Sequence, residues 1–349
     1  MRVSDFDFDL PKSFIAQKPV DPRDNCRLLV FNTMENSVQH LRFFDIVDFL
    51  DPNDVLVLNT SKVIPARIIF SENGKECEIF LLKDLGGGEF LVLTRPGRKF
   101  PTGKVFSLSP RLKFEVRNIF EDGSRTIRFV GTYSPEIFTE LLALGTIPLP
   151  PYLKADDGVS FADYQTIYAT EDGSVAAPTA GLHFTENLLN DISRRGVETE
   201  ELILHVGQGT FAPVKSENIS DHKMHSEEYF ISKDTASRLN FSRSQGKRFI
   251  AVGTTCVRTL ESNFSLRNDF SSGRNETDIF IYPGVHEWRV VDGLITNFHL
   301  PKSTLLMLVA SFLEHKGVVR PRERLLELYE LAKSENYRFF SFGDAMFIY

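Results

Sequence analysis

Residues 55–58 form a run of four apolar side chains that follows Asp54, and this pattern predicts a buried strand. The strand should end in the polar segment 59–62, which includes Asn59. Upstream, the chain starts with an extended acidic stretch, and residues 43–50 predict a short helix. The first 66 residues therefore contain a strand that belongs in the interior of a sheet.

From Arg67 to about residue 130 the pattern changes to short β-rich runs separated by glycine-containing turns. The runs cover residues 77–82, 89–93, 113–116 and 126–129. Closely spaced strands with such turns favour an antiparallel sandwich or a small barrel. This segment is therefore predicted to be a separate all-β domain.

The β pattern stops near Thr132, and a predicted helix over 135–144 leads into residues 147–152, whose three prolines favour a stiff, extended connector. Beyond this boundary helices and strands alternate. Strands are predicted at 201–206, 249–253, 278–282 and 288–296, and helices from Thr185 to Gly196, from Thr254, at 304–316 and at 321–334. Alternation of this kind favours an α/β sheet.

These patterns predict an α/β protein in which a discontinuous α/β sheet domain carries an inserted all-β, barrel-like domain. The α/β domain should comprise residues 1–66 and 147–349, and the inserted domain residues 67–146. A length of 349 residues agrees with two domains at roughly 150 residues each. No repeat and no low-complexity segment interrupts this organisation.

Composition and charge limit the class of protein. The chain has 47 acidic and 40 basic residues, which excludes a uniformly basic protein that coats nucleic acids. Its apolar stretches are far shorter than the ~20 residues that cross a bilayer, and its acidic N-terminus lacks an apolar signal core. Three scattered cysteines fit reduced thiols. We expect a cytoplasmic protein with no membrane partner.

Candidate chemistry concentrates between residues 183 and 299, which hold six of the eight histidines. The strongest motif is residues 204–211, where an apolar strand leads to His205 and glycines flank Gln208. Glycines at Gly207 and Gly209 would let backbone amides approach a ligand closely, although a tight turn would need them too.

Four further segments are candidates for binding or proton transfer. Residues 178–185 place small residues before a helix N-terminus, where N–H groups favour anions. Residues 251–262 place a glycine and two threonines where a strand becomes a helix, which is the ligand crevice of an open α/β sheet; Arg258 and Glu261 on that helix could instead form a surface ion pair. Residues 296–304 and the terminal segment 343–346 supply further polar side chains.

The pair His222 and His225 could bind a metal or transfer protons. No carboxylate or cysteine completes a recognisable ligand spacing, so no metal site is predicted. Basic residues cluster unevenly in the predicted β domain, at Arg95, Arg98, Lys99 and Lys104, and again at 320–324. A local positive stripe can bind phosphates in an acidic protein, and a solvated loop is the alternative.

Several of these motifs, in this order, give the chain a family resemblance. Residues 177–185, 204–211, 252–262 and 296–307, together with 59–67 and 342–346, resemble the S-adenosylmethionine:tRNA ribosyltransferase-isomerase family of queuosine biosynthesis. The resemblance spans nearly the whole chain. It implies an α/β domain with an inserted β-barrel.

The resemblance also implies the substrates. S-adenosylmethionine would donate its ribosyl group to tRNA bearing 7-aminomethyl-7-deazaguanine at the wobble position, giving epoxyqueuosine-tRNA, adenine and methionine. No cofactor is expected beyond S-adenosylmethionine, which is a substrate. A monomer is the expected oligomeric state.

The predicted site residues fall into three groups. The catalytic candidates are His205, His183, His299, Gln208 and Thr210. The substrate-binding candidates are Asn59, Arg67, Thr179, Gly181, Gly207, Gly209, His222, His225, Glu227, Thr254, Thr255, Arg258, Glu261, Asn297, Ser303 and Asp344, and the tRNA-binding candidates are Arg95, Arg98, Lys99 and Lys104.

Two other functions remain open on the sequence. A metal-dependent hydrolase would use His205, His222, His225 and His299 as ligands, and a non-catalytic RNA-binding module would keep only the basic segment.

Overall fold

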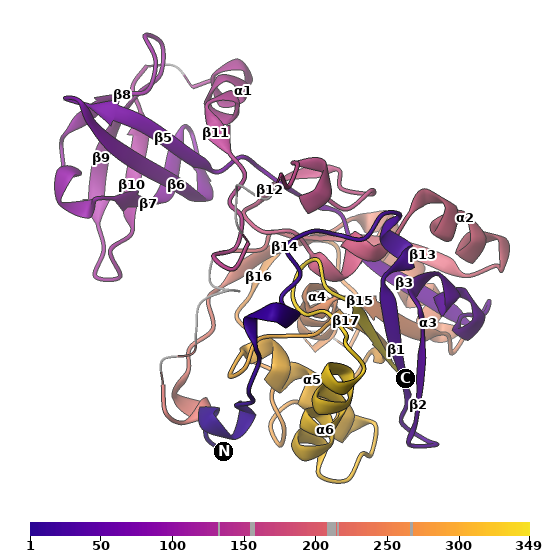
Figure 1. The fold of residues 1–349 in the computed structure, drawn as a ribbon. Helices are drawn as coiled ribbons and strands as arrows, with labels where there is room; N and C mark the ends of the chain where they lie inside the picture. The colour runs from indigo at the N-terminus through magenta and orange to yellow at the C-terminus, as the bar shows by residue number, and fades with distance from the viewer. Residues whose placement is uncertain (132, 154–157, 208–213, 215, 266–267) are drawn as a thin grey trace. The chain divides into compact units, whose positions relative to one another are not determined.

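The computed structural model describes residues 1–131, 133–153, 158–207, 214, 216–265 and 268–349, and the chain forms two compact units (Figure 1). The α/β unit comprises residues 1–61, 151–171 and 177–349, and the β unit comprises residues 62–150 and 172–176. Gln208, Gly209 and Thr210, which the sequence marks as candidates, lie outside the described residues.

The α/β unit is built on a nine-stranded sheet with the order β16-β14-β13-β3-β15-β17-β18-β1-β2. Its strands are β1 (Arg27–Asn32), β2 (Ser37–Arg42), β3 (Asp54–Asn59), β13 (Glu198–Leu204), β14 (Glu227–Ile231), β15 (Arg248–Val252), β16 (Gly273–Thr277), β17 (Val291–Asn297) and β18 (Ala345–Ile348). The four central strands β13, β3, β15 and β17 run parallel to one another, while β14, β16, β18 and β2 each have an antiparallel neighbour.

Helices cover both faces of this sheet. The α-helices of the unit are α2 (Glu186–Arg194), α3 (Lys233–Ser244), α4 (Thr254–Ser265), α5 (Thr304–His315) and α6 (Pro321–Ser334), and α5 and α6 lie side by side (Figure 1). Leu56 and Leu58 join a core that also includes Leu188 and Ile192 of α2. The alternate residues of β3 face the opposite way, toward the side on which α4 contacts β3, β15 and β17.

The described residues also form short 3-10 helices. They are η1 (Val3–Phe6), η2 (Lys12–Phe14), η3 (Arg23–Asn25), η4 (Phe43–Phe49), η5 (Gly97–Lys99), η7 (Ala162–Tyr164), η8 (Thr179–His183) and η10 (Ile219–Asp221). No helix of the described residues is both long and apolar enough to cross a membrane.

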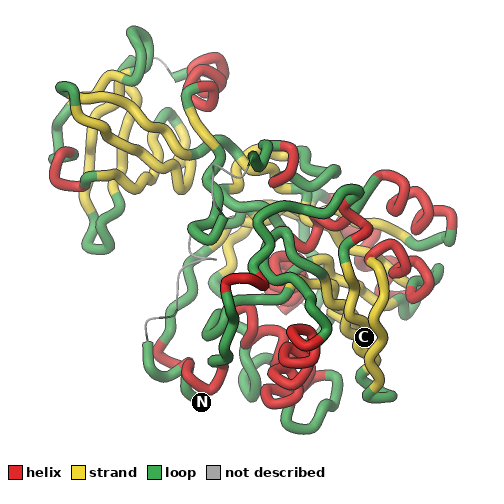
Figure 2. Tube along the Cα trace, viewed as in Figure 1, coloured by secondary structure: helices red, strands yellow, loops and turns green. Residues whose placement is uncertain are grey.

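The β unit is a curled antiparallel sheet with the order β11-β5-β6-β7-β10-β9-β8, and Figure 2 shows that strands dominate it. Its elements are β5 (Arg67–Glu72), β6 (Lys75–Gly86), β7 (Glu89–Arg95), β8 (Val105–Ser107), β9 (Lys113–Ile119), β10 (Arg125–Phe129), β11 (Gly145–Thr146) and α1 (Pro135–Ala143). Phenylalanine rings fill the interior, with Phe100 and Phe106 stacked at 4.5 Å between centroids. The short strands β4 (Ser61–Val63) and β12 (Glu171–Ser174) pair separately.

The predicted fold class is confirmed, as a large α/β sheet and a separate antiparallel sheet. Locally, Thr185 caps α2 by accepting a hydrogen bond from the Leu188 amide, as predicted. The predicted strand over residues 278–282 is wrong, because the edge strand β16 ends at Thr277. The sequence of β16 is almost entirely polar, so backbone pairing with β14 creates this strand without an apolar pattern. Residues 43–49 form a 3-10 helix.

Glu261 of α4 holds the start of β17 and was assigned to the substrate site from the sequence. Its carboxylate is 1% exposed and accepts the amides of Arg289, Val290 and Val291 at 2.9–3.0 Å. Nε2 of His286 lies 3.4 Å away. Burial raises the pKa of Glu261, but these hydrogen bonds outweigh it and hold the pKa below its usual value. These bonds give Glu261 a structural role at the start of β17, and its assignment to the substrate site stays a prediction.

We predict that Glu261→Ala destabilises the α/β unit by at least about 3 kcal/mol, because three buried amides lose their acceptor. Trp288, the chain's one tryptophan, precedes the anchored residues and reports their unfolding in urea. The stability that Glu261 contributes is present above its unfolded pKa and is lost as the pH falls through the folded pKa. The control is Glu287→Ala, whose side chain is 81% exposed and should change stability by less than about 0.5 kcal/mol. Equal effects of the two changes would contradict the anchoring role.

Candidate functional site

The carboxyl edge of the four parallel strands gathers most of the predicted site residues. The chain passes from β3 to β13 on one side, then crosses to β15 on the other side and continues to β17. The strand order therefore reverses between β3 and β15. Open α/β sheets bind ligands at such a reversal, outside the carboxyl ends of the strands. We place the candidate site at this edge.

Asn59 ends β3 and ties it to β13. Its amide group donates to the carbonyl of Leu204 and its Oδ1 accepts from the Leu204 amide, both at 3.0 Å. The same oxygen accepts the amide of Ser61 at 3.1 Å. Asn59 is 1% exposed and its side chain is bonded to backbone groups, so it positions β3 against β13, and its assignment to substrate binding stays a prediction.

His205 follows β13 directly and is half-buried. Its Nδ1 lies 2.8 Å from Oγ of Ser61, and its backbone amide donates to the carbonyl of Glu228 at 3.0 Å. Ser61 is itself fixed through Asn59. The sequence analysis did not select Ser61, although a hydroxyl two residues beyond a buried strand end is a recognisable signal. The contact with Ser61 therefore fixes the orientation of the His205 imidazole at this edge of the sheet.

A buried ion pair supports the chain after His205. Arg258 of α4 and Glu227 of β14 are 5% and 6% exposed and form an ion pair through Nη1 and Oε2. The other carboxylate oxygen of Glu227 accepts the amide of Gly207 at 3.0 Å. The surface ion pair between Arg258 and Glu261 that the sequence allowed is wrong. Through these contacts Arg258 and Glu227 position the chain at Gly207, and their assignment to substrate binding stays a prediction.

The loop at η8 approaches the N-terminus of α4. A Cβ atom on Gly181 would lie 2.0 Å from the hydroxyl of Tyr168, so only glycine fits there. A Cβ on Gly253 would lie 3.4 Å from that of Ala180, and Gly253 has a φ of +88°. Thr254 and Thr255 begin α4 beside this contact. Helix N-termini favour anions, so this is where a substrate carboxylate would fit.

His183 is completely enclosed between Cys26 and Asn297. Asn297 donates from Nδ2 to the carbonyl of Phe340 at 3.1 Å and to Nε2 of His183 at 3.0 Å, and its Oδ1 accepts from Thr179. Nε2 of His183 is therefore an acceptor, and Nδ1 carries the proton toward Sγ of Cys26 at 3.2 Å.

This Cys26, His183 and Asn297 chain has the composition of a cysteine-nucleophile site, but its electrostatics oppose that chemistry. Burial raises the pKa of the Cys26 thiol well above its usual range and, with smaller contributions from arginines, lowers the pKa of His183 to about 3. Both groups stay neutral at pH 7. Asn297 and Thr179 position His183, and the catalytic assignment of His183 stays a prediction that this burial does not favour.

His299 is buried in a similar way, and its catalytic assignment also stays a prediction. It is 8% exposed, burial lowers its pKa to about 3, and its Nε2 lies 2.8 Å from Oγ1 of Thr296. Its backbone amide donates to the hydroxyl of Tyr329. Among the three predicted catalytic histidines, His205 is the one that the structure leaves half-buried at the strand edge.

Three other predicted site residues are bonded locally, and their assignments stay predictions. Ser303 caps α5 by accepting the Leu306 amide, Asp344 accepts the amides of Arg27 and Arg338, and Arg67 lies in β5, 3.2 Å from Glu78. His225 is exposed and His222 is half-buried against Phe280. Among the described residues, no group of three or more His, Cys, Asp or Glu side chains could hold a metal ion.

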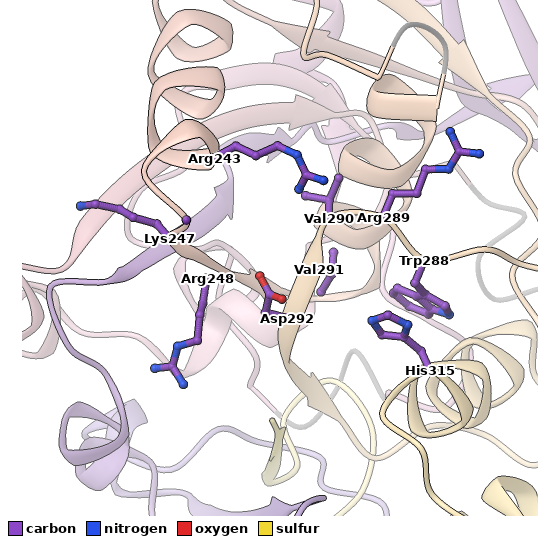
Figure 3. Close-up of a pocket in the computed structure, with 10 residues that line it drawn as sticks. Arg243, Lys247, Arg248, Trp288, Arg289, Val290, Val291, Asp292 and His315 are labelled. Carbon is purple, nitrogen blue, oxygen red and sulfur yellow. The ribbon is translucent and has the colours of Figure 1, made fainter.

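The opposite, amino edge of β15 and β17 holds a cavity of ≈ 400 Å³ (Figure 3). It is lined by Arg243, Gly246, Lys247, Arg248, Trp288, Arg289, Val290, Val291, Asp292 and His315. Its cations are largely compensated: Arg248 pairs with buried Asp54 at 2.7 Å, Lys247 with Glu198 at 2.7 Å and Arg289 with Glu287 at 2.9 Å. This cavity therefore does not compete with the carboxyl edge as an anion site.

The family of this chain follows from its similarity to known proteins. The model of the queuosine biosynthesis protein family matches residues 3–348. The chain belongs to this family. It is similar to the S-adenosylmethionine:tRNA ribosyltransferase-isomerases of Thermosipho melanesiensis (48% identical over 350 residues) and Clostridium kluyveri (49% over 352), with 100% of each chain covered.

A solved structure of this family extends the comparison to three dimensions. The crystal structure of S-adenosylmethionine tRNA ribosyltransferase from Thermotoga maritima is 36% identical, with 99% of this chain and 100% of that chain covered and a TM-score of 0.56. The family resemblance inferred from the sequence motifs is confirmed.

In this queuosine-family chain, we predict that His183 stays neutral, protonated on Nδ1, from pH 5 to pH 8. The check is the ¹⁵N chemical shift of its ring. Because its folded pKa lies below the unfolded value, its contribution to stability is complete above about pH 6.5 and declines as the pH falls toward the folded pKa. A ring that titrates near pH 6.5 would contradict the positioning role.

Proposed function

We propose that this protein transfers and isomerises the ribosyl group of S-adenosylmethionine onto 7-aminomethyl-7-deazaguanine at the tRNA wobble position. The products are epoxyqueuosine-tRNA, adenine and methionine. The observation that carries the proposal is the family match over residues 3–348 together with relatives of that name covered over their full length. The carboxyl edge of the sheet is the proposed place for this reaction.

The chemistry needs a positioned base. The sulfonium of S-adenosylmethionine acidifies the hydrogens on ribose C5′, and their removal gives an ylide that can open the ribose and begin expulsion of adenine. The amine on the tRNA must then attack as a free base. His205 suits proton transfer because it is half-buried at the end of β13 and Ser61 orients its ring.

The neighbouring groups are suited to binding the substrate rather than to transferring a proton. The N-terminus of α4, with Thr254 and Thr255, would hold the carboxylate of the methionine moiety. Glycine at positions 181 and 253 lets the loop at η8 lie close to the start of α4 without a clash. The metal-dependent hydrolase has no support, because its four proposed histidine ligands form no metal-holding cluster among the described residues. S-adenosylmethionine is consumed as a substrate, and the absence of other cofactors stays a prediction.

The β unit is the proposed tRNA-binding element. Lys104 is partly neutralised by Glu72 at 3.2 Å, and Lys99 donates to the carbonyl of Glu76. Arg95 and Arg98 are therefore expected to bind most strongly to the phosphates. Because tRNA is the substrate, we infer that the protein works in the cytoplasm, and the monomeric state stays a prediction.

The test of this function uses S-adenosylmethionine labelled either in the ribose or in the methyl group, with precursor tRNA. We expect ribose label in the tRNA, and adenine and methionine released in equal amounts. Methyl label in the RNA without adenine release would reject the function. Binding of tRNA with no transfer of either label would favour the non-catalytic RNA-binding module.

His205→Ala should lower turnover by about 10²-fold or more while the fold is kept, the usual size of a general acid–base contribution. Ser61→Ala should shift the pH profile of kcat, and Ser61→Thr, which keeps the hydroxyl, should restore it. Circular dichroism and thermal unfolding confirm the fold. A folded His205→Ala variant with full activity would return His205 to a structural role.

Charge reversal at Arg98 and Lys99 should weaken tRNA binding and leave the affinity for S-adenosylmethionine unchanged. For each phosphate that is no longer bound, the slope of log affinity against log salt should flatten by roughly 0.7 to 0.9. Reversal of Arg194 and Arg195, an adjacent exposed basic pair on and after α2, makes the same charge change and is the matched control. Unchanged affinity and slope would move the RNA site elsewhere, such as residues 320–324.

A further inference from the structure

The segment 278–282 leaves the sheet at the candidate site. Strand β14 pairs antiparallel with β13, with Leu204 opposite Tyr229, and with β16, with Glu227 opposite Thr277. Strand β16 therefore runs in the same direction as β13. The chain after Thr277 emerges at the same carboxyl edge as the chain after Leu204, on the far side of Glu227.

Buried Arg258 fixes this segment to the His205 loop. Its Nη2 donates to the carbonyl of Thr277 and its Nε to that of Ile279, both at 3.3 Å. The same guanidinium binds Glu227, whose second oxygen accepts the amide of Gly207. Hydrogen bonds thus connect Ile279, which precedes Phe280, through Arg258 and Glu227 to Gly207. Gly207 is two residues from His205.

Residues 280–282 alternate between the interior and the surface. Ile281 is 2% exposed and anchors the segment, while Phe280 and Tyr282 on either side are half-buried. The ring centroids of Phe280 and Tyr282 are 4.8 Å apart at 47°, and His222 meets Phe280 edge-on at 5.3 Å and 76°. We call these three side chains, His222, Phe280 and Tyr282, the aromatic cluster.

The aromatic cluster combines three features that favour a planar ligand. Its rings are held by an anchored backbone, they keep accessible surface, and they lie at the edge where the substrates are proposed to react. Burial and nearby His225 lower the pKa of His222, which favours its neutral, stackable form. Stacking of a nucleobase on an aromatic side chain contributes about 1–3 kcal/mol and tolerates any base.

We propose that the aromatic cluster stacks the bicyclic base of a substrate, a purine or a 7-deazapurine, with Phe280 as the principal contact. This inference rests on the proposed function for the identity of the ligand. Two sources supply such a ring: the adenine of S-adenosylmethionine and the 7-deazaguanine base of the tRNA.

The experiment measures two constants for each variant: the equilibrium Kd of labelled S-adenosylmethionine without tRNA, and the KM of precursor tRNA at saturating S-adenosylmethionine. Phe280→Leu keeps an apolar side chain but removes the ring, and Phe280→Tyr keeps the ring. Phe241→Leu is the matched control, because Phe241 lies on α3 and is 63% exposed.

We expect Phe280→Leu to raise one constant by about 5- to 150-fold, the range that 1–3 kcal/mol implies. Phe280→Tyr and Phe241→Leu should stay within about two-fold of the wild type. A rise in the Kd of S-adenosylmethionine assigns the cluster to adenine, and a rise confined to the KM of tRNA assigns it to the wobble base. If Phe280→Leu does not fold, Tyr282→Leu replaces it in the same measurements.

Both constants within two-fold of wild type in a folded Phe280→Leu variant would overturn the proposal, as would equal changes in Phe241→Leu. The outcome is separable from that of the proposed function. If the wild type transfers no ribose label, the function fails, while binding of labelled adenosine to the wild type and Phe280→Leu still tests stacking, with weaker binding expected in the variant.

Discussion

Strand β3 pairs in parallel with β13 on one side and with β15 on the other, and these two pairings bring Asn59, His205 and the N-terminus of α4 to one edge of the sheet. Residues 55–58 are at most 3% exposed, so the strand is buried on both faces. A one-residue slip of β3 would exchange the side chains on its two faces and disrupt the packing on both faces of the sheet. The register therefore sets which residues stand at the carboxyl edge, and the reversal of strand order beside β3 opens a place for a ligand there.

The rigidity of this edge comes from polar side chains that are satisfied inside the protein. Asn59 closes the gap between β3 and β13, Glu227 and Arg258 hold the chain after His205, and Asn297 holds His183. A buried polar group without a hydrogen-bond partner would destabilise the folded state. Each of these side chains is therefore bonded to a neighbour, and it fixes that neighbour's position. Most polar side chains of the candidate site thus hold the backbone in place, and few, such as His205, remain for substrate chemistry.

Elements with a local signal could be predicted from the sequence. The apolar run of β3, the threonine cap of α2 and the proline at the start of α6 each act within one turn or strand, and the predicted range of α6 agrees with the structure. The strand predicted at 278–282 was wrong, and the polar strand β16 beside it, which pairs through the backbone alone, was missed, as were β1, β14 and α3. The family, too, followed from motifs that are contiguous in sequence.

The roles of individual residues could not be predicted, because they depend on distant partners. His183 acquires its low pKa through burial, and its hydrogen-bond partner Cys26 is 157 residues away in the chain. Arg258 and Glu261 stand one turn apart on α4, but each binds a different part of the sheet. Sequence spacing indicates which side chains can meet on a helix, whereas tertiary packing decides which ones do.

The claim that the carboxyl edge is the substrate site is tested most directly by a crystal structure of the protein with S-adenosylmethionine bound. We predict ligand density outside the carboxyl ends of β3 and β15, between His205 and the N-terminus of α4. Density confined to the cavity at the amino edge beside Arg248 and Asp292, or to the β unit, would contradict this account.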